Sequence, residues 1–205
     1  MLELEIAILV VIISAIIGPL LVTRYRHYLH QKSKTDPVKE AIDCNCLVDD
    51  QLDLLKEELD ADRIWISQFH NGGNFYPTGK SVQKFSVFYE ICTPGISHIS
   101  ETFKNIPVSL FSKSISHLYS DGEILIPNYS KGSTFGLSTF AEGTNAKSSY
   151  LFSLKSIQDE YIGTLGVEYC TRVRKLNEEQ LNIARTKAIT IGTLLSSYLY
   201  EGKKK

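Results

Sequence analysis

Residues 150–169 constrain the fold of this chain more than any other stretch. The segments YLFSLKSI (150–157) and YIGTLGVEY (161–169) are rich in β-branched and aromatic residues, and only the turn QDE (158–160) separates them. Two such runs joined by a short polar turn are typical of a β-hairpin. Because the strands of a hairpin pair antiparallel, we expect an antiparallel sheet at the centre of the domain.

Three more segments have the composition of strands: RIWISQF (63–69), KFSVFYEI (84–91) and EILIPN (123–128). Together with the hairpin they predict a sheet of about five or six strands. In the second segment, apolar residues occupy every other position, and alternate residues of a strand point to the same side. We therefore expect one face of the sheet to carry Phe85, Val87, Tyr89 and Ile91.

Helical patterns frame these strands. Apolar residues spaced by three and four predict a first helix at 38–60, a last helix at 177–199, and shorter helices at 108–118 and 137–142. Asn177 is followed by two glutamates, which is typical of the start of a helix. Strands joined by tight turns and framed by terminal helices indicate an α+β domain.

The first helix has the spacing of a coiled-coil seam. The residues of this seam are Val38, Ala41, Asn45, Val48, Leu52, Leu55 and Leu59. Barely three heptads are present, and an amphipathic helix packed on its own domain shows the same spacing. The sequence leaves both interpretations open, and they are compatible with a homodimer formed through helices 38–60 and 177–199.

Residues 6–22 read IAILVVIISAIIGPLLV and contain no charge. This length is near the lower limit for a membrane-spanning helix, which predicts a single transmembrane anchor. Basic residues follow at once, at 24, 26, 32 and 34, whereas glutamates precede the segment. By the positive-inside rule we expect the N-terminus outside and the remainder of the chain in the cytoplasm.

Composition excludes some classes of partner and site. The chain has 22 basic and 23 acidic residues and a formal net charge of −1, which argues against nucleic acid as a partner. The four cysteines, Cys44, Cys46, Cys92 and Cys170, include no C-x-x-C pair, so their spacing predicts free thiols and no metal site.

The stretch FHNGGNFYPTGKS (69–81) ends like a phosphate-binding P-loop. The motif requires a glycine at position 74, where this chain has asparagine, and a helix after the loop, where this chain has a strand pattern. We therefore interpret 70–83 as a long hairpin loop, with Asn71-Gly72-Gly73-Asn74 forming its turn. Such a loop can serve as a ligand lid or a partner surface. Within it, His70 is the main candidate for direct contact with a ligand or a partner.

The order of these elements resembles that of GAF domains, small-ligand sensory modules related to PAS domains. The resemblance covers about residues 40–199. It is carried by ELDADRIWISQF, EILIPN, SSYLFSLKSIQDEYIGTLGVEY and KLNEEQLNIARTKAITIG. It implies a ligand pocket between one face of the sheet and the 95–145 crossover.

The pocket implied by the resemblance has a set of candidate residues that can stack on a ligand or bond to it. They are His70, Asn71, Phe85, Tyr89, Tyr119, Asn128, Tyr129, Phe135, Thr139, Phe140, Tyr150 and Glu168. The cofactor is left unknown: neither the Cys-His pair of bilin-binding GAF domains nor the N-K-F-D-E signature of cyclic-nucleotide GAF domains is recognisable. Some GAF-like enzymes reduce methionine sulfoxide with cysteines, for which Cys92 and Cys170 are the candidates.

These observations lead to one functional expectation and two alternatives. We expect a membrane-anchored GAF-like module that binds a small molecule or recruits a protein, and that lacks a catalytic output domain. The alternatives are a ligand-free interaction module that uses the 70–83 loop, as in a phage accessory membrane protein, and a thiol-based reductase. The expected parts are an anchor, a basic linker, a dimerisation helix, the GAF-like domain and a basic tail, at 1–23, 24–37, 38–61, 62–200 and 201–205.

Overall fold

The computed structural model describes residues 21–25, 36–74, 78, 80–131 and 135–201. The chain divides into two units, residues 1–42 and residues 43–205, and the fold below is that of the second unit. None of the helices in the described part of the chain is long and apolar enough to cross a membrane. The predicted anchor at 6–22 lies outside the described residues apart from Leu21 and Val22, and so does most of the basic linker.

The elements follow one another as the sequence predicts, with the addition of a two-residue strand, β3, and of two 3-10 turns. In chain order they are α3 (Pro37–Leu59), β1 (Arg63–Asn74), β2 (Ser81–Cys92), β3 (Ile106–Pro107), η2 (Val108–Phe111), α4 (Ser112–Asp121), β4 (Glu123–Ile126), η3 (Tyr129–Lys131), α5 (Ser138–Thr144), β5 (Ser148–Lys155), β6 (Tyr161–Tyr169) and α6 (Glu178–Glu201).

The six strands form one antiparallel sheet in the order β3-β2-β1-β6-β5-β4. The predicted hairpin is β5–β6, and β6 pairs on its other side with β1. The first and last strands therefore pair at the centre of the sheet. This confirms the α+β class and the number of strands.

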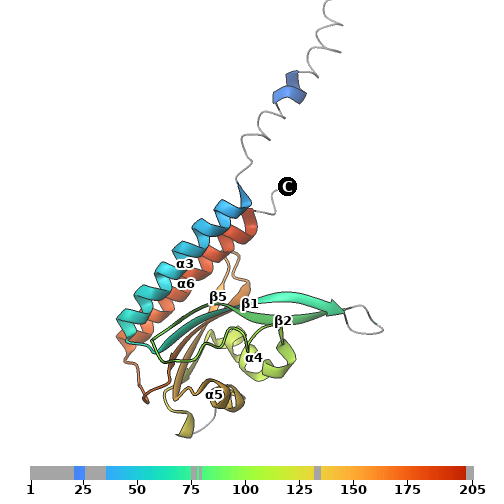
Figure 1. Cartoon of the computed structure of the whole chain (residues 1–205). Coiled ribbons are helices and arrows are strands. Elements are labelled where there is room, and N and C mark those ends of the chain that lie inside the picture. Colours follow the sequence, from blue (N-terminus) through green and yellow to red (C-terminus); the bar gives the residue numbers. More distant parts are fainter. Residues whose placement is uncertain (1–20, 26–35, 75–77, 79, 132–134, 202–205) are drawn as a thin grey trace, which may run out of the picture. The chain divides into compact units, whose positions relative to one another are not determined.

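Helices α3 and α6 lie side by side on one face of the sheet (Figure 1). The apolar core on this face includes fully buried Leu52, Leu55, Leu59, Ile64, Ile66, Leu154, Leu165, Val167, Ala184 and Ile191. A side-chain carbon on Gly192 would come within 2.4 Å of the Lys155 carbonyl oxygen, so glycine is needed for α6 to lie this close to β5.

Helices α4 and α5 lie on the opposite face, which we call the crossover face (Figure 1). Its core is more aromatic and includes Trp65, Val87, Ile99, Phe103, Leu118, Ile124, Leu137, Phe140 and Leu151. The segments between β2 and β5 supply most of the cover. The sheet is thus buried on both sides, by two helices on one face and by the crossover on the other.

The predicted seam of the first helix turns inward from residue 48. Val48, Leu52, Leu55 and Leu59 are fully buried in the core of their own domain. Asn45 is exposed and accepts a hydrogen bond of 2.6 Å from the Tyr89 hydroxyl. For this part of the helix the intramolecular interpretation is therefore correct, and these side chains are not available for a coiled coil.

The prediction of a long loop at 70–83 is wrong, because most of these residues belong to strands. Strands β1 and β2 continue to pair as far as Asn74 and Ser81, with an irregularity in the register after Asn71. Asn71-Gly72-Gly73-Asn74 is therefore the irregular end of a strand and not a turn, because the glycines accommodate a bulge as well as a turn. The β1–β2 hairpin consequently extends past the rest of the sheet as a two-stranded ribbon (Figure 1).

The prediction that Phe85, Val87, Tyr89 and Ile91 share a face is also wrong. The register between β1 and β2 shifts by one residue at Phe88, where Val87 pairs with Ser67 and Tyr89 pairs with Ile66. A bulge reverses the alternation of side chains beyond it. The first two residues therefore face the crossover, whereas Tyr89 and Ile91 pack against the α3/α6 core.

Candidate functional site

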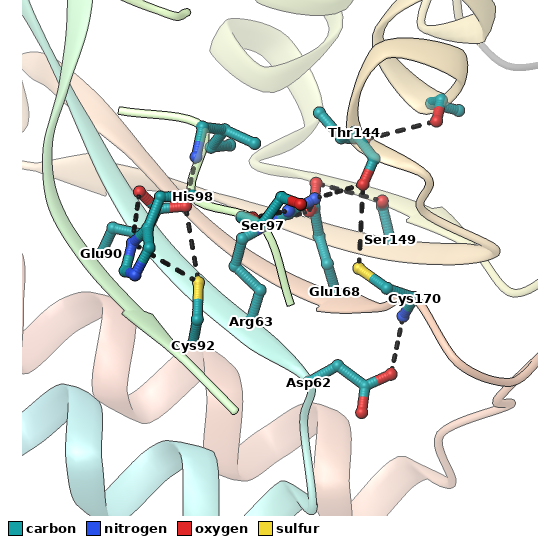
Figure 2. Close-up of polar contacts among 12 residues, drawn as sticks. Asp62, Arg63, Glu90, Cys92, Ser97, His98, Thr144, Ser149, Glu168 and Cys170 are labelled. Atoms are coloured by element: carbon teal, nitrogen blue, oxygen red, sulfur yellow. Dashed lines mark hydrogen bonds and ion pairs between the residues drawn. The ribbon is translucent and has the colours of Figure 1, made fainter. Parts of the chain in front are cut away.

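A buried ion pair lies on the crossover face, at the end of the sheet where β1 begins and β6 ends. Arg63 begins β1, and its guanidinium binds Oε2 of Glu168 on β6 through Nε at 2.8 Å and Nη2 at 2.5 Å. The side chains are 1% and 0% exposed. Arg63 also donates to the carbonyl oxygens of Ser97 at 2.8 Å and Thr144 at 2.9 Å. One side chain thus joins the sheet to the crossover loop and to α5 (Figure 2).

Burial acts on the two partners in opposite ways. Burial raises the pKa of Glu168, and Arg63 opposes that rise. Burial lowers the pKa of Arg63, but the charge and hydrogen bonds of Glu168 outweigh it and leave the pKa raised. The guanidinium therefore stays charged, and it needs Glu168 as its counterion. Such a pair ties elements together, and it is poorly placed to bind a substrate, because all three guanidinium nitrogens already donate hydrogen bonds within the domain.

A second polar cluster lies at the end of β2. Both carboxylate oxygens of Glu90 accept backbone hydrogen bonds, from Ile99 at 2.7 Å and from Ser100 at 3.0 Å. Nδ1 of His98 lies 3.2 Å from the same carboxylate, and Sγ of Cys92 lies 3.6 Å from it. Figure 2 shows Glu90, Cys92 and His98 turned toward one another beside Arg63. Burial alone would raise the pKa of Glu90, but these backbone hydrogen bonds outweigh it, so the pKa is lowered.

The two thiols of this region are not activated. Burial, reinforced by Glu90, raises the pKa of Cys92 to about 12, although Arg63 opposes the rise. Burial likewise raises the pKa of Cys170 to about 11. Thiolate chemistry requires the opposite shift, because the thiolate is the nucleophile. All four cysteines are free thiols.

Asp62 fastens the chain where β1 begins. Its Oδ2 accepts hydrogen bonds from the backbone N–H groups of Cys170 at 2.7 Å and Thr171 at 2.8 Å, and from the Thr171 hydroxyl at 2.8 Å. Burial alone would raise the pKa of Asp62, but these bonds outweigh it and the pKa is lowered. The carboxylate therefore stabilises the end of β6 in its ionised form.

Trp65 lies over the middle of the sheet, and Gly166 makes room for it. A side-chain carbon at position 166 would lie 2.1 Å from Cε2 of the indole, which no packing can accommodate. The ring is 5% exposed and packs against Phe140 with 5.8 Å between centroids. Its N–H has no hydrogen bond of normal geometry in the described structure, although the indole is close enough to Glu168 to lower the pKa of that carboxyl.

The crossover face holds a cavity of only about 40 Å³. Its lining is mainly aromatic and aliphatic: Trp65, Ser67, Phe69, Phe85, Phe111, Ser114, Ile115, Leu118, Leu137, Phe140, Leu151 and Thr164. Ligand pockets are typically several hundred cubic ångströms in volume. This space has room for a few water-sized molecules at most, so side chains fill the position where a GAF-like pocket is expected.

A wider groove of about 610 Å³ lies at the surface between β4, β5 and α6. Its arginine, Arg185, binds Glu123 through Nε at 2.8 Å and through Nη2 at 2.9 Å, and it binds Glu178 through Nη1 at 2.5 Å. Its charge is therefore already compensated. The groove is a surface depression lined by paired charges and does not resemble a ligand site.

The structure disperses the twelve candidate residues. Phe85 and Phe140 line the small cavity, and Glu168 belongs to the buried ion pair. Tyr129 and Phe135 pack against the crossover core. Tyr89 and Tyr150 lie in the opposite core, toward α3 and α6. The remaining five are elsewhere.

These five have ordinary local roles or exposed positions. Nε2 of His70 bonds to Ser86 Oγ at 2.9 Å in the β1–β2 ribbon, where Asn71 is exposed. Asn128 accepts bonds from the backbone and hydroxyl of its neighbour at 130, Tyr119 is 72% exposed, and Thr139 is exposed on α5. The candidates therefore do not form one site.

Sequence reasoning missed the residues that the crossover face brings together. Arg63, Trp65, Ser67 and Phe69 alternate along β1 and point to this face. The buried pair could have been suspected from Arg63, because this charged residue starts a strand that is otherwise mostly apolar. Glu90 gave no such signal, because it lies beyond the bulge that reverses the pattern of β2.

No protein-family model and no curated protein matches this sequence. Solved structures do match its fold. A far-red cyanobacteriochrome photoreceptor aligns over 88% of this chain and 98% of that chain, with a TM-score of 0.61 and 11% identity. A phycocyanobilin-bound GAF domain from a cyanobacterial phytochrome aligns over 82% of this chain and 98% of that chain, with a TM-score of 0.57 and 14% identity.

A third structural relative comes from a different kind of organism. The GAF domain region of a Geobacter sulfurreducens protein aligns over 80% of this chain and 99% of that chain, with a TM-score of 0.59 and 18% identity. At such identities the likeness concerns the fold alone. The chain has the fold of GAF sensory domains, as the order of its elements predicts.

Proposed function

We propose that this chain is a GAF-fold interaction module that works through protein contacts and does not hold a large ligand on its sheet. The observation that supports this most directly is the cavity of about 40 Å³ on the crossover face. A bilin such as the one in the structural relative, or a cyclic nucleotide, requires a space roughly ten times larger. Aromatic side chains of the chain itself occupy that position.

The chemistry of the buried groups supports a non-enzymatic role. Arg63 and Glu168 satisfy each other, and the pKa values of Cys92 and Cys170 are raised to about 12 and about 11. A reductase needs a thiolate and a resolving partner, and a hydrolase needs a positioned base beside its nucleophile. His98 lies beside Cys92, with 3.8 Å between Nδ1 and Sγ, but the pKa of that thiol is raised and not lowered, so the pair lacks an activated nucleophile.

The β1–β2 ribbon is the surface that we propose for partner contact. In the described part of the chain, no third strand pairs with residues 69–74 or with residues 81–83. A two-stranded ribbon by itself is marginally stable in water. Phe88 at its base is 58% exposed and packs edge to face with His70. The occupant that fits is a partner protein that adds a strand to an open edge of the ribbon.

We also propose that the module is a homodimer. On α3, Leu47 and Leu54 are seven residues apart, so they lie on one side of the helix, and about half of each side chain is exposed. Ile189 on α6 is 70% exposed. A second copy of the chain would cover these apolar side chains and complete a bundle of four helices.

The proposed location is a membrane, through residues 6–22, with the GAF-fold domain in the cytoplasm. This part of the proposal rests on the uncharged segment and the basic residues that follow it. Cys46 is exposed and follows the segment, so an impermeant thiol reagent applied to intact cells should leave it unlabelled until the cells are opened. Equal labelling before and after opening would contradict the orientation.

Native mass spectrometry of the purified full-length chain in detergent tests the function. We expect the mass of two polypeptides and no retained small molecule. A stoichiometric adduct of several hundred daltons would overturn the closed crossover face. A monomer without an adduct would remove the dimer from the proposal, but it would leave the closed face intact.

A further inference from the structure

Glu90, Cys92 and His98 form a cluster that the proposed interaction function does not use. Glu90 and Cys92 are two residues apart on β2, so their side chains share the crossover face. His98 reaches them from the loop that follows the strand. Within the described residues these three supply one oxygen, one sulfur and one nitrogen that lie within 4.8 Å of one another.

The separations between these atoms are close to those between the ligands of a tetrahedral metal ion, with the sulfur nearest one carboxylate oxygen of Glu90 and the imidazole nearest the other. Cys92 Sγ lies 3.6 Å from Glu90 Oε1 and 3.8 Å from His98 Nδ1. His98 Nδ1 lies 3.2 Å from Glu90 Oε2. Tetrahedral Zn²⁺, with bonds of about 2.3 Å to sulfur and about 2.0–2.1 Å to nitrogen and oxygen, places its ligand atoms about 3.3–3.6 Å apart. One oxygen of Glu90 and the other two donor atoms lie within 4.8 Å of one another, and a turn of the exposed His98 side chain would bring all three to a common ion.

The donor set selects the kind of metal. A thiolate with an imidazole and a carboxylate suits a first-row divalent ion of intermediate softness, above all Zn²⁺. The thiol disfavours Mg²⁺ and Ca²⁺, which take oxygen ligands. Three protein ligands leave a fourth position for water or for a group from another molecule.

The surroundings hold the ligands in place. The Glu90 side chain is 3% exposed, and the N–H groups of Ile99 and Ser100 fix its two oxygens at 2.7 Å and 3.0 Å. Outer hydrogen bonds of this kind orient metal ligands. The nearby guanidinium of Arg63 is compensated by Glu168, so it does not repel a cation with its full charge. The His98 side chain is 66% exposed, so the fourth ligand position of a bound ion would face solvent.

We propose that Glu90, Cys92 and His98 bind one Zn²⁺ ion with a fourth, exchangeable position facing solvent. On binding, the Cys92 thiol transfers its proton to solvent, and a sulfur–metal bond replaces the S–H bond without any change of oxidation state. The ion would fasten the crossover loop to the end of β2, next to the backbone contacts that Glu90 already makes.

Cobalt spectroscopy on the full-length chain tests the site, because Co²⁺ takes the place of Zn²⁺ and reports thiolate ligation by absorption. We expect one equivalent of Co²⁺ to give tetrahedral visible bands and an ultraviolet sulfur-to-metal charge-transfer band, both removed by added Zn²⁺. Cys92→Ser should abolish the charge-transfer band. It should also weaken Co²⁺ binding at least about 100-fold, since even outer partners of a metal site contribute 10–100-fold.

Two matched controls separate this site from incidental binding. Cys170→Ser removes the other half-buried thiol of the region and should leave the charge-transfer band intact. His98 is exposed, so His98→Gln should fold normally and yet lose the tetrahedral bands, whereas His117→Gln should retain them. The proposal is overturned if the unaltered chain shows no charge-transfer band at one equivalent of Co²⁺, if the band survives Cys92→Ser, or if His98→Gln binds Co²⁺ as tightly as the unaltered chain.

Discussion

On its α3/α6 face the sheet meets two long helices through aliphatic side chains, and Leu52, Leu55 and Leu154 are fully buried there. On its crossover face it meets short helices and loops through aromatic rings, a buried ion pair and a small cavity. The first face depends on apolar packing, which pH does not change. The second also depends on charged groups and on how completely the rings fill the space. The same six strands thus carry an apolar core on one face, and on the other a core that also contains buried charged groups.

The largest expected effect comes from breaking the ion pair of the crossover face. Arg63→Met leaves Glu168 buried without its counterion, which typically costs about 3–5 kcal/mol of the free energy of unfolding. Denaturant unfolding of the full-length chain, followed by circular dichroism, measures this loss.

A double variant shows whether the lost counterion is the cause. Arg63→Met combined with Glu168→Leu should recover part of the loss, because no charge is then left unpaired. Recovery should be incomplete, since the carbonyl oxygens of Ser97 and Thr144 lose their donor. A loss below about 1 kcal/mol for Arg63→Met would contradict the role assigned to this pair.

Two leucines on β5 compare the faces directly. Leu154 points into the α3/α6 core and Leu151 into the crossover core, and both are at least 97% buried. Each change to alanine should cost about 2–5 kcal/mol. Only Leu151→Ala enlarges an existing cavity, so only this variant should be stabilised by added benzene, which binds apolar cavities of about 150 Å³.

Thermal unfolding with and without benzene makes this measurement, and the unaltered chain is the control. Equal stabilisation of Leu154→Ala and Leu151→Ala by benzene would show that the two faces are packed alike. Stabilisation of the unaltered chain would show that the crossover face is more open than about 40 Å³.

A smaller, pH-dependent effect is expected at Asp62. Its pKa is lowered in the folded chain, so the stability that it adds is fully present above its unfolded pKa of about 3.9 and is lost as pH falls through the folded value. Asp62→Asn should therefore lower the free energy of unfolding by about 1–3 kcal/mol at pH 7.

The stability difference between Asp62→Asn and the unaltered chain should narrow as pH falls below about 4. Urea unfolding at several pH values checks this, with Asp53→Asn as a control at an exposed carboxylate on α3. A difference that stays constant down to pH 3 would contradict the ionised role of Asp62.

The smallest expected effect concerns the start of α6. The side chain of Asn177 accepts the backbone N–H of Gln180 at 2.9 Å, and that of Gln180 accepts the backbone N–H of Asn177 at 3.2 Å. Asn177→Ala should cost about 1 kcal/mol. As a control, Thr190→Ala at an exposed position of the same helix should lower the free energy of unfolding by less than Asn177→Ala does. A larger loss for Thr190→Ala would show that the cap is not the main local source of helix stability.

Local signals in the sequence predicted much of the fold. The β5–β6 hairpin follows from two strand patterns and a three-residue polar turn, and α6 begins at Glu178, directly after the asparagine predicted to cap it. These features depend on neighbours within a few positions. The order of such elements was sufficient to identify the GAF fold.

The site depends on contacts that no local pattern contains. Arg63 and Glu168 are 105 positions apart, and their pairing follows from the β1–β6 register. The bulge at Phe88 depends on the pairing between β1 and β2, and it moved Tyr89 to the opposite face. The volume of the cavity depends on side chains from residue 65 to residue 164. These three facts explain why the candidate residues were dispersed.

Trp65 offers the most direct test of the central claim, that side chains and not a ligand close the crossover face. It is the only tryptophan of the chain, and it lines the small cavity. The measurement is acrylamide quenching of its fluorescence after the full-length chain has been unfolded, freed of small molecules and refolded. We predict blue-shifted emission and weak quenching, equal to those of the chain before unfolding. Strong quenching after refolding, reversed only by adding back the removed small molecules, would contradict the account.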